Sequence, residues 1–317
     1  MESRETAQSA AQQWYKGELH FHCERSTIPE MLATYRRRRY DFCISTEHDA
    51  VHQLAPYRGP DGLCHSDPAR TGAGRPLLLM GGSEMSLTIP RSAAKGAAEG
   101  MPVHVGAFPL RAPVEKSALA WPTLDRLRQL ARPPIIAINH PRAGGLERHW
   151  SEADVIEAIA HGATHLELNP RNHGIELSLR LWDAVLSQGH QVYGILTNDA
   201  HEMANIGRYG ATLVQATALT AEAIVAGLRQ GACYALESGC RARLRHVLCN
   251  SQEITANATD AQELHFIGAK GRTLHVVYAE EGHYQASAEE RYVRIEAVDD
   301  NGRRLFTQPV WLDEHQR

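Results

Sequence analysis

Short apolar segments alternate with amphipathic segments along most of the chain, beginning near Gly17. The apolar segments have the length of strands, and the segments between them repeat apolar residues at the spacing of helices. We expect strands at residues 18–22, 42–45, 77–80, 103–108, 135–139, 165–168 and 192–196, and helices at 28–40, 123–131, 151–160, 175–188 and 221–230. This alternation is typical of βα units around a parallel sheet, and seven such strands favour a barrel.

The pattern changes after residue 238 to alternating polar and apolar positions separated by turn signals. Strands are expected at residues 241–248, 273–279, 292–297 and 304–311. We therefore divide the chain into an α/β domain over residues 1–238 and a small antiparallel β domain over residues 239–317. Segments 58–76 and 91–100 are rich in turn-forming or small residues and are expected to be loops near the ligand positions.

The composition is that of a globular protein, with 43% hydrophobic and 22% charged residues in a chain of 317. The net charge of −4 argues against a dedicated nucleic-acid binder, because the only basic run is at residues 36–39. No apolar stretch is long enough to cross a bilayer, and the first residues lack the apolar core of a secretory signal. We therefore expect a cytoplasmic protein that binds neither nucleic acid nor membranes, with homo-oligomerisation left open.

Histidines are unusually frequent, and the chain has eighteen of them. His20 and His22 stand two residues apart at the end of the first expected strand, so both imidazoles face the same side and can reach one cation. An isolated pair of this kind is more often incidental. The six cysteines form no Cys-x-x-Cys pair, which argues against a structural zinc knuckle or a redox motif.

Imidazoles and carboxylates recur at the ends of the other expected strands. They are Glu47, His48, Glu84, His104, His140, Asp199 and His201. Strand ends of a βα barrel open onto one face, where so many ionisable groups would repel or remain unsatisfied unless cations held them. Because the set contains no thiolate, it favours Mn²⁺, Zn²⁺ or Fe²⁺. A metal-bridging hydroxide would then make hydrolysis the expected reaction.

Five segments in this order resemble the motifs of the PHP (polymerase and histidinol phosphatase) superfamily. They are Gly-Glu-Leu-His-Phe-His, Ser-Thr-Glu-His-Asp, Gly-Ser-Glu-Met-Ser, Asn-His-Pro and Asn-Asp-Ala-His. The resemblance extends from about Trp14 to the end. The C-terminal part, including Tyr-Ala-Leu-Glu-Ser-Gly-Cys from Tyr234, is similar to the β appendage of the branch that includes carbaryl-type carbamate hydrolases. The resemblance as a whole implies an α/β fold, namely a distorted (β/α)7 barrel with a small C-terminal antiparallel β domain.

The resemblance also implies a ligand set. One metal site would be formed by His20, His22, Glu84 and Asp199, and Glu84 would bridge to a second site with His104 and His140. His48 and His201 match a third site of many relatives, which place Asp or His where this chain has Thr27. Because threonine is a poor ligand, a third cation requires Glu24 in its place. The alternative is that His48 and His201 hold substrate or transfer protons, while Glu47 orients a ligand or a bound water.

Arginines near the expected site favour an anionic substrate. Arg142 follows His140 by two residues, and Arg171 follows the sixth strand, with Asn172 beside it. Guanidinium groups bind phosphate or carboxylate with two hydrogen bonds, although each arginine could instead pair with a loop carboxylate. Lys16 and Arg25 are weaker candidates for the same pocket.

The preferred function is therefore a phosphoesterase acting on a small phosphorylated metabolite with two or three divalent cations. The second is hydrolysis of a carbamate, ester or amide. The third is a non-catalytic module that binds metal.

Overall fold

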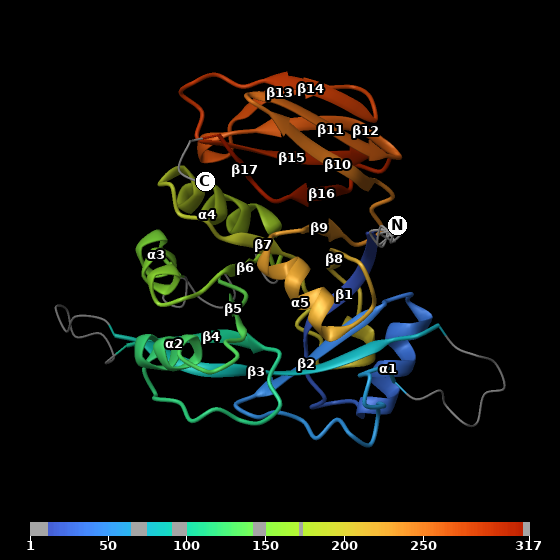
Figure 1. Cartoon of the computed structure of the whole chain (residues 1–317), viewed down its shortest axis with the longest axis vertical. Coiled ribbons are helices and arrows are strands. Elements are labelled where there is room, and N and C mark those ends of the chain that lie inside the picture. Colours follow the sequence, from blue (N-terminus) through green and yellow to red (C-terminus); the bar gives the residue numbers. More distant parts are fainter. Residues whose placement is uncertain (1–11, 65–74, 91–99, 142–149, 171–173, 313–317) are drawn as a thin grey trace, which may run out of the picture.

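The computed structural model describes residues 12–64, 75–90, 100–141, 150–170 and 174–312. Strands and helices alternate through its first part (Figure 1). The strands are β1 Gln13–Phe21, β2 Phe42–His48, β3 Leu78–Ile89, β4 Met101–Phe108, β5 Ile135–Ile138, β6 His165–Glu167, β7 Tyr193–Ile195, β8 Gly210–Ala216 and β9 Cys233–Glu237. The helices are α1 Ile28–Arg37, α2 Ala120–Arg128, α3 Glu152–Ala160, α4 Ile175–Ser187 and α5 Ala221–Arg229, with a 3₁₀ turn, η2, at Met203–Asn205. Every expected strand and helix of this part has a counterpart, which confirms the mixed α/β class.

The strands of this part form a mixed ladder rather than a parallel one. β1, β2 and β3 are parallel, as are β5, β6 and β7, whereas β4 is antiparallel to both β3 and β5. β4 runs antiparallel to β3. Ile89 of β3 pairs with Met101 of β4, and Thr88 pairs with Pro102, so the partner residue moves forward along β4 as the position moves back along β3. A uniform series of βα units was therefore the wrong expectation at this point.

The expected (β/α)7 barrel is not confirmed, because the ladder continues beyond β1 instead of closing by regular strand pairing. From β7 the order is β6, β5, β4, β3, β2, β1, β8, β9 and then the C-terminal strands. The segment after β7 meets β1 at a single bridge between Phe21 and Ala200. Backbone hydrogen bonds join His22 N to Ala200 O (2.8 Å) and Ala200 N to His20 O (3.3 Å). These contacts hold the end of β1 beside the segment that follows β7.

The C-terminal strands are antiparallel, as expected. They are β10 Arg243–Asn250, β11 Glu253–Thr259, β12 Ala261–Ile267, β13 Thr273–Val277, β14 Glu281–Gln285, β15 Tyr292–Asp299, β16 Arg304–Thr307 and β17 Val310–Trp311, with a 3₁₀ turn, η3, at Ala269–Gly271. β10, β11 and β14 form a separate three-stranded sheet, and β16 pairs with β9. Because the main ladder crosses residue 239, the domain boundary there stays a prediction.

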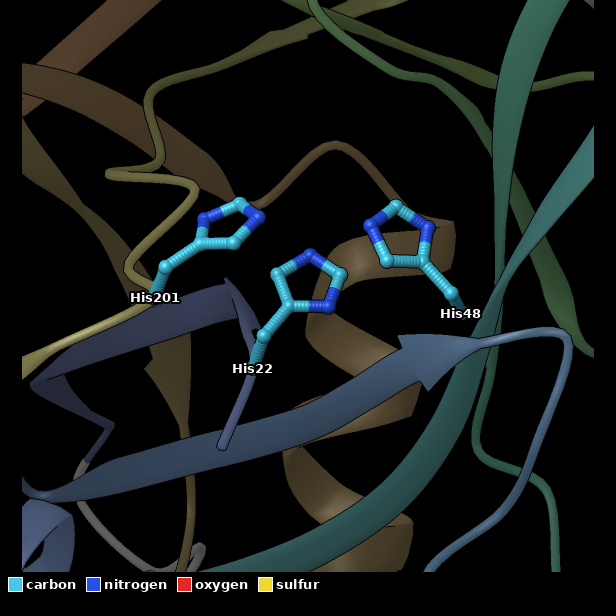
Figure 2. A group of neighbouring side chains, drawn as sticks. All are labelled: His22, His48 and His201. Atoms are coloured by element: carbon cyan, nitrogen blue, oxygen red, sulfur yellow. The ribbon is translucent and has the colours of Figure 1, made fainter. Parts of the chain in front are cut away.

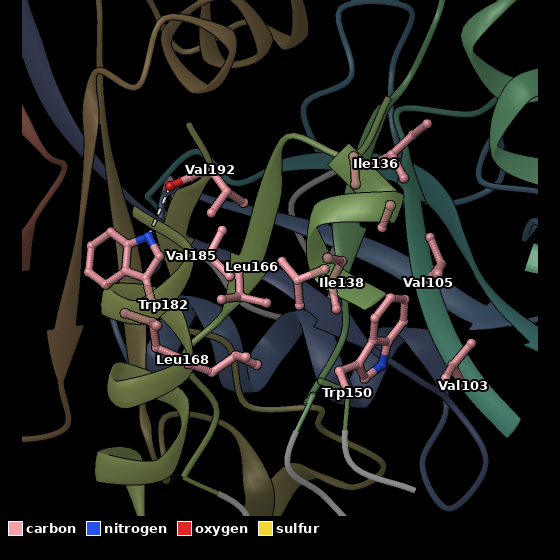
Figure 3. Close-up of a cluster of buried hydrophobic side chains, with 14 of the residues drawn as sticks. Val103, Val105, Ile136, Ile138, Trp150, Leu166, Leu168, Trp182, Val185 and Val192 are labelled. Atoms are coloured by element: carbon pink, nitrogen blue, oxygen red, sulfur yellow. Dashed lines mark hydrogen bonds between the residues drawn. The ribbon is translucent and has the colours of Figure 1, made fainter. Parts of the chain in front are cut away.

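A large apolar cluster supports strands β4 to β7 (Figure 3). Trp150 and Trp182 are 2% and 0% exposed and pack with residues of these strands. The Trp182 indole donates a hydrogen bond of 2.9 Å to the carbonyl oxygen of Val192, so its one polar atom is satisfied in the core. This packing fixes α4 against the strands whose ends carry His140 and Asp199.

Among the described residues, no helix is both long and apolar enough to span a bilayer.

Candidate metal centre

Distant segments of the chain deliver the expected ligands to one place. β1 carries His20, and His22 follows it directly, while β2 ends in Glu47 and His48. His140 follows β5, and Asp199 and His201 follow β7. Asp199 and His140 both have positive φ angles, 47° and 26°, which non-glycine residues rarely adopt. Such backbone strain is concentrated at functional sites.

Glu84 and His104 do not follow strands, contrary to the expectation. β3 continues past Glu84 to Ile89, and His104 lies within β4, where it pairs with Ser86. Their side chains reach the centre because two antiparallel neighbours bring these positions together. Although β4 runs in the reverse direction, His104 within it still reaches the same site as the ligands that follow the ends of parallel strands.

Glu84 is the central side chain of the site, and it is fully buried. Its Oε1 atom lies 3.2 Å from His20 Nε2, 3.2 Å from His104 Nδ1 and 2.9 Å from His140 Nε2, and its Oε2 atom lies 3.3 Å from His22 Nε2 and 3.1 Å from His48 Nδ1. One carboxylate thus contacts five imidazoles. This geometry is what a carboxylate shared between cations requires.

The donor atoms fall into three overlapping groups, in each of which they lie within 4.8 Å of one another. The groups are His20 with Glu84, His140 and Asp199; His48 with Glu84 and His104; and His22 with His48 and His201. Figure 2 shows the last group, with the His22 ring between the other two. Its centroid is 4.5 Å from that of His48 and 4.4 Å from that of His201. The structure therefore places His22 with His48 and His201 as well as near Asp199, which lies 3.3 Å away.

Thr27 has a structural role at the start of α1. Its side chain accepts a hydrogen bond from the Glu30 backbone, and the Glu30 side chain bonds back to Thr27, which makes a capping box. Glu24 instead extends toward the third group, with Oε1 3.7 Å from His48 Nε2 and Oε2 3.7 Å from His201 Nε2. Glu24 is thus the carboxylate available to that group.

The crowded donors fit divalent cations. His20 Nε2 and His22 Nε2 lie 3.0 Å apart. A neutral imidazole has only one donor nitrogen, and in both rings Nδ1 already faces a carboxylate, Glu167 for His20 and Glu47 for His22. The two Nε2 atoms that face each other are then both acceptors, which a cation between them would satisfy. Glu84 Oε2 and His104 Nδ1 are buried, and their contacts of 3.1–3.3 Å within the described part of the chain do not have the geometry of hydrogen bonds. Buried polar atoms normally have partners, so atoms left in this way favour an ion in their midst.

The electrostatics of the cluster also favour positive charge. Burial by itself would raise the pKa of Glu84 and lower that of His20. The imidazoles nevertheless hold the pKa of Glu84 well below its usual range, and the carboxylates hold the pKa of His20 well above its usual range. Burial likewise opposes ionisation of Glu47, but hydrogen bonds from His22 and the Cys23 backbone lower its pKa to about 2. The carboxylates therefore stay ionised and attract cations.

Glu167 is a buried carboxylate behind the centre that the sequence did not single out. Its Oε1 atom accepts hydrogen bonds from His20 Nδ1 and Thr197 Oγ1, both at 2.8 Å, and its Oε2 atom accepts one from the His140 backbone at 2.6 Å. Asn139 similarly donates to Glu84 Oε1 at 2.9 Å. The available signal was an ionisable residue inside the apolar strand at residues 165–168.

Glu18 was also missed, and it ties β1 to the segment that carries Asp199. It accepts hydrogen bonds from the backbones of Asn198 (3.1 Å) and His20 (3.2 Å), and another from the Asn198 amide. Burial raises its pKa to about 7. These bonds fix His20 and Asp199 relative to each other.

The expected substrate-binding residues Arg142, Arg171 and Asn172 lie outside the described residues. A cavity of about 370 Å³ opens beside Asp199 and His201, and it is also lined by Arg25 and Arg208. Neither of these two guanidinium groups has a carboxylate partner within the described part of the chain, and Arg208 lies over the Tyr209 ring at 5.4 Å. Arg208 was not singled out from the sequence. Lys16 donates to the Arg38 carbonyl oxygen instead (3.2 Å).

No protein-family model matches the chain, and no curated protein does. Among the solved structures that match is a two-domain protein from Bacteroides vulgatus ATCC 8482 containing a predicted PHP-like metal-dependent phosphoesterase. It has 15% identity and a TM-score of 0.47, over 93% of this chain and 87% of that chain. Another is an amidohydrolase from Chromobacterium violaceum with bound sulfate and no metal. It has 14% identity and a TM-score of 0.39, over 58% of this chain and 87% of that chain. At these TM-scores neither structure assigns the chain to a family.

Proposed function

We propose that the chain is a metal-dependent hydrolase of the PHP type, and that it acts as a phosphoesterase on a small phosphorylated metabolite. The observation that carries the proposal is Glu84, a buried carboxylate with imidazoles against both oxygen atoms. Divalent cations held there, Mn²⁺, Zn²⁺ or Fe²⁺, would supply Lewis-acid chemistry, which lowers the pKa of a bound water and stabilises negative charge on the substrate.

The remaining steps belong to side chains at the edge of the centre. His48 and His201 are partly exposed, at 32% and 19% of their side chains, so they can contact a substrate. Burial lowers the pKa of His48, which keeps its imidazole neutral near pH 7 and able to accept a proton. Glu47 holds His22 in position through Nδ1 at 3.3 Å. His48 and His201 act either in proton transfer or, with His22, as ligands of a third cation.

Arginines supply the proposed recognition of an anionic group. Arg25 and Arg208 line the cavity beside Asp199, and Arg142, Arg171 and Asn172 are assigned to substrate from the sequence. A phosphoryl group has several anionic oxygens, which guanidinium groups bind with paired hydrogen bonds.

A carbamate, ester or amide hydrolase is the second candidate. Glu24 and Glu202 line the same cavity as the two arginines and limit its positive charge. A cavity with two arginines and two glutamates would repel a neutral substrate, which develops a single oxyanion, less than a doubly charged phosphate ester. The resemblance of the C-terminal segment to carbaryl-type hydrolases supports the same candidate.

The test combines elemental analysis with a substrate panel of phosphate esters, carbamates and amides. We expect the metal-loaded chain to turn over phosphate esters. We expect Glu84→Gln, which removes the charge and keeps the shape, to lose bound metal and turnover together. Its metal affinity should fall by more than the roughly 10–100-fold loss that follows removal of a partner outside the ligands. Glu157→Gln, on the surface of α3, is the matched control.

Each alternative has its own outcome in this experiment. Turnover of carbamates or amides alone would replace the phosphoesterase with the second candidate. A metal-loaded chain that hydrolyses nothing in the panel would support a non-catalytic binding module. Full metal content and full rate in Glu84→Gln would contradict the assignment of the centre itself.

A further inference from the structure

A thiol, a carboxylate and an imidazole meet beside the candidate metal centre. Cys23 follows β1, Glu47 lies near the end of β2, and His52 lies in the segment after β2. One donor atom from each lies within 4.8 Å of the others, and His52 Nε2 is 3.4 Å from Glu47 Oε2. This combination differs from the donor groups around Glu84, which contain no sulfur.

Hydrogen bonds hold these donors in place. His52 Nδ1 is 2.7 Å from the hydroxyl of buried Ser45, so its other nitrogen is turned toward Glu47. The Cys23 backbone donates to Glu47 Oε2 at 3.1 Å, and His22 Nδ1 lies 3.3 Å from Glu47 Oε1. Ligands fixed by outer hydrogen bonds in this way are typical of metal sites, because little ordering remains to be done when the cation binds.

We propose that Cys23, Glu47 and His52 form a separate site for Zn²⁺ or another thiophilic divalent cation. Binding forms a sulfur–metal bond and breaks the S–H bond of Cys23, and the proton leaves to solvent. The two positive charges of the cation then balance the thiolate and the carboxylate. Three protein ligands leave one position for water, which is common in zinc sites.

The position of the site explains both its access and its coupling. The side chains of Glu47 and His52 are 18% and 27% exposed, so a cation can enter from solvent. Glu47 faces His22 through one oxygen and the proposed site through the other. A cation bound at Cys23 therefore acts on the neighbouring centre through a single carboxylate.

Cobalt titration of the full chain tests the proposal, because a cobalt–thiolate bond has a charge-transfer absorption that nitrogen and oxygen ligands do not produce. We expect the band in the wild type and in Cys249→Ser, which removes an exposed thiol of β10. We expect Cys23→Ser to abolish it. The readout is independent of hydrolysis, since the Glu84 groups contain no sulfur and can bind Co²⁺ without the band.

Two further variants keep the test decisive if Cys23→Ser does not fold. His52→Gln removes a ligand and should weaken the Co²⁺ affinity measured from the band by more than the roughly 10–100-fold loss that follows removal of a partner outside the ligands. Ser45→Ala removes only the outer hydrogen bond and should weaken it by roughly 10–100-fold, with the band still reached at higher Co²⁺. Absence of the band in the wild type at saturating Co²⁺, or its persistence in Cys23→Ser, would overturn the proposal, as would unchanged affinity in His52→Gln.

Discussion

At the scale of single residues, the candidate centre depends on carboxylates that solvent does not reach. Glu84 and Glu167 are 0% and 1% exposed, and each is surrounded by hydrogen-bond donors. Removing the charge of such a carboxylate is costly, because the neighbouring buried donors lose their hydrogen-bond acceptor. We therefore expect substitutions of these carboxylates to weaken metal binding before they disturb the fold.

Glu167→Gln tests whether this carboxylate positions His20. The amide keeps the shape of the side chain but removes its charge. Its NH₂ group is a donor that would face another donor, either the His140 backbone N–H or the His20 Nδ1 and Thr197 hydroxyl groups. We expect the affinity for Mn²⁺ or Zn²⁺, measured by chelator competition, to fall about 10–100-fold. Glu157→Gln should leave it unchanged. Equal affinities in the two variants would show that Glu167 has no positioning role.

His165 makes a separate prediction about pH. Burial lowers its pKa to about 3, against about 6.5 for an unperturbed imidazole. Between these values the unfolded chain binds a proton that the folded chain does not, so the free energy of unfolding decreases as the pH falls below 6.5. His165→Asn removes this linkage and retains a partner for Thr164, whose hydroxyl is 2.9 Å from His165 Nδ1.

The measurement is urea unfolding at pH 7 and pH 5. The wild type should lose about 2 kcal/mol more than His165→Asn over this interval. His283→Asn, at an exposed position of β14, should follow the wild type. Parallel losses in the wild type and His165→Asn would mean that His165 titrates normally in the folded chain.

At the scale of elements, α1 shows that one residue can fit two patterns. The resemblance stated from the sequence aligns Thr27 with a position at which PHP proteins place a metal ligand, whereas the structure uses Thr27 to cap the helix. The sequence Thr-Ile-Pro-Glu contains the capping-box signal, so the capping role follows from the local residue pattern alone.

Thr27→Ala separates the two roles. Loss of an N-cap costs about 1 kcal/mol, which urea unfolding would detect, while the number of bound cations should not change. Ser151→Ala is a matched control, because Ser151 and Asp154 form the same capping box at α3. Loss of a cation from Thr27→Ala, with Ser151→Ala intact, would instead identify Thr27 as part of a metal site.

At the scale of the whole molecule, a buried ion pair joins the C-terminal strands to α4. Arg294 of β15 donates to both oxygens of Asp183, at 2.8 and 2.7 Å, and also to Glu296 at 2.7 Å. Arg294 is 1% exposed and Asp183 is 3% exposed. This bidentate pair links β15 to α4, two elements far apart in sequence. Figure 1 labels both elements.

Arg294→Met should lower the free energy of unfolding by roughly 3–5 kcal/mol, because it leaves buried carboxylates without their cation. The double variant Arg294→Met with Asp183→Asn should recover part of the loss. Urea unfolding measures both, and bound metal should stay constant because neither residue contacts Glu84. A double variant no more stable than Arg294→Met would show that uncompensated charge is not the cause.

Local patterns in the sequence determined where strands and helices form and which residues are candidate ligands, because these features depend on neighbours a few positions apart. His20 and His22 could be paired from strand periodicity alone. The strands β8, β9, β11, β12 and β14 were missed. In β11 and β14, alanine or glycine occupies several inward positions, which weakens the apolar signal of a strand.

Only the tertiary structure decided the direction of β4, the continuation of the ladder into the C-terminal strands, and the grouping of His22 with His48 and His201. The same is true of the hydrogen bonds that Glu167 and Asn139 make and of the place of Arg208 beside the cavity. The physical reason is that strand direction and the pairing of buried charges are settled by contacts between residues tens to more than a hundred positions apart. Such contacts form only when the whole chain packs, and no local spacing records them.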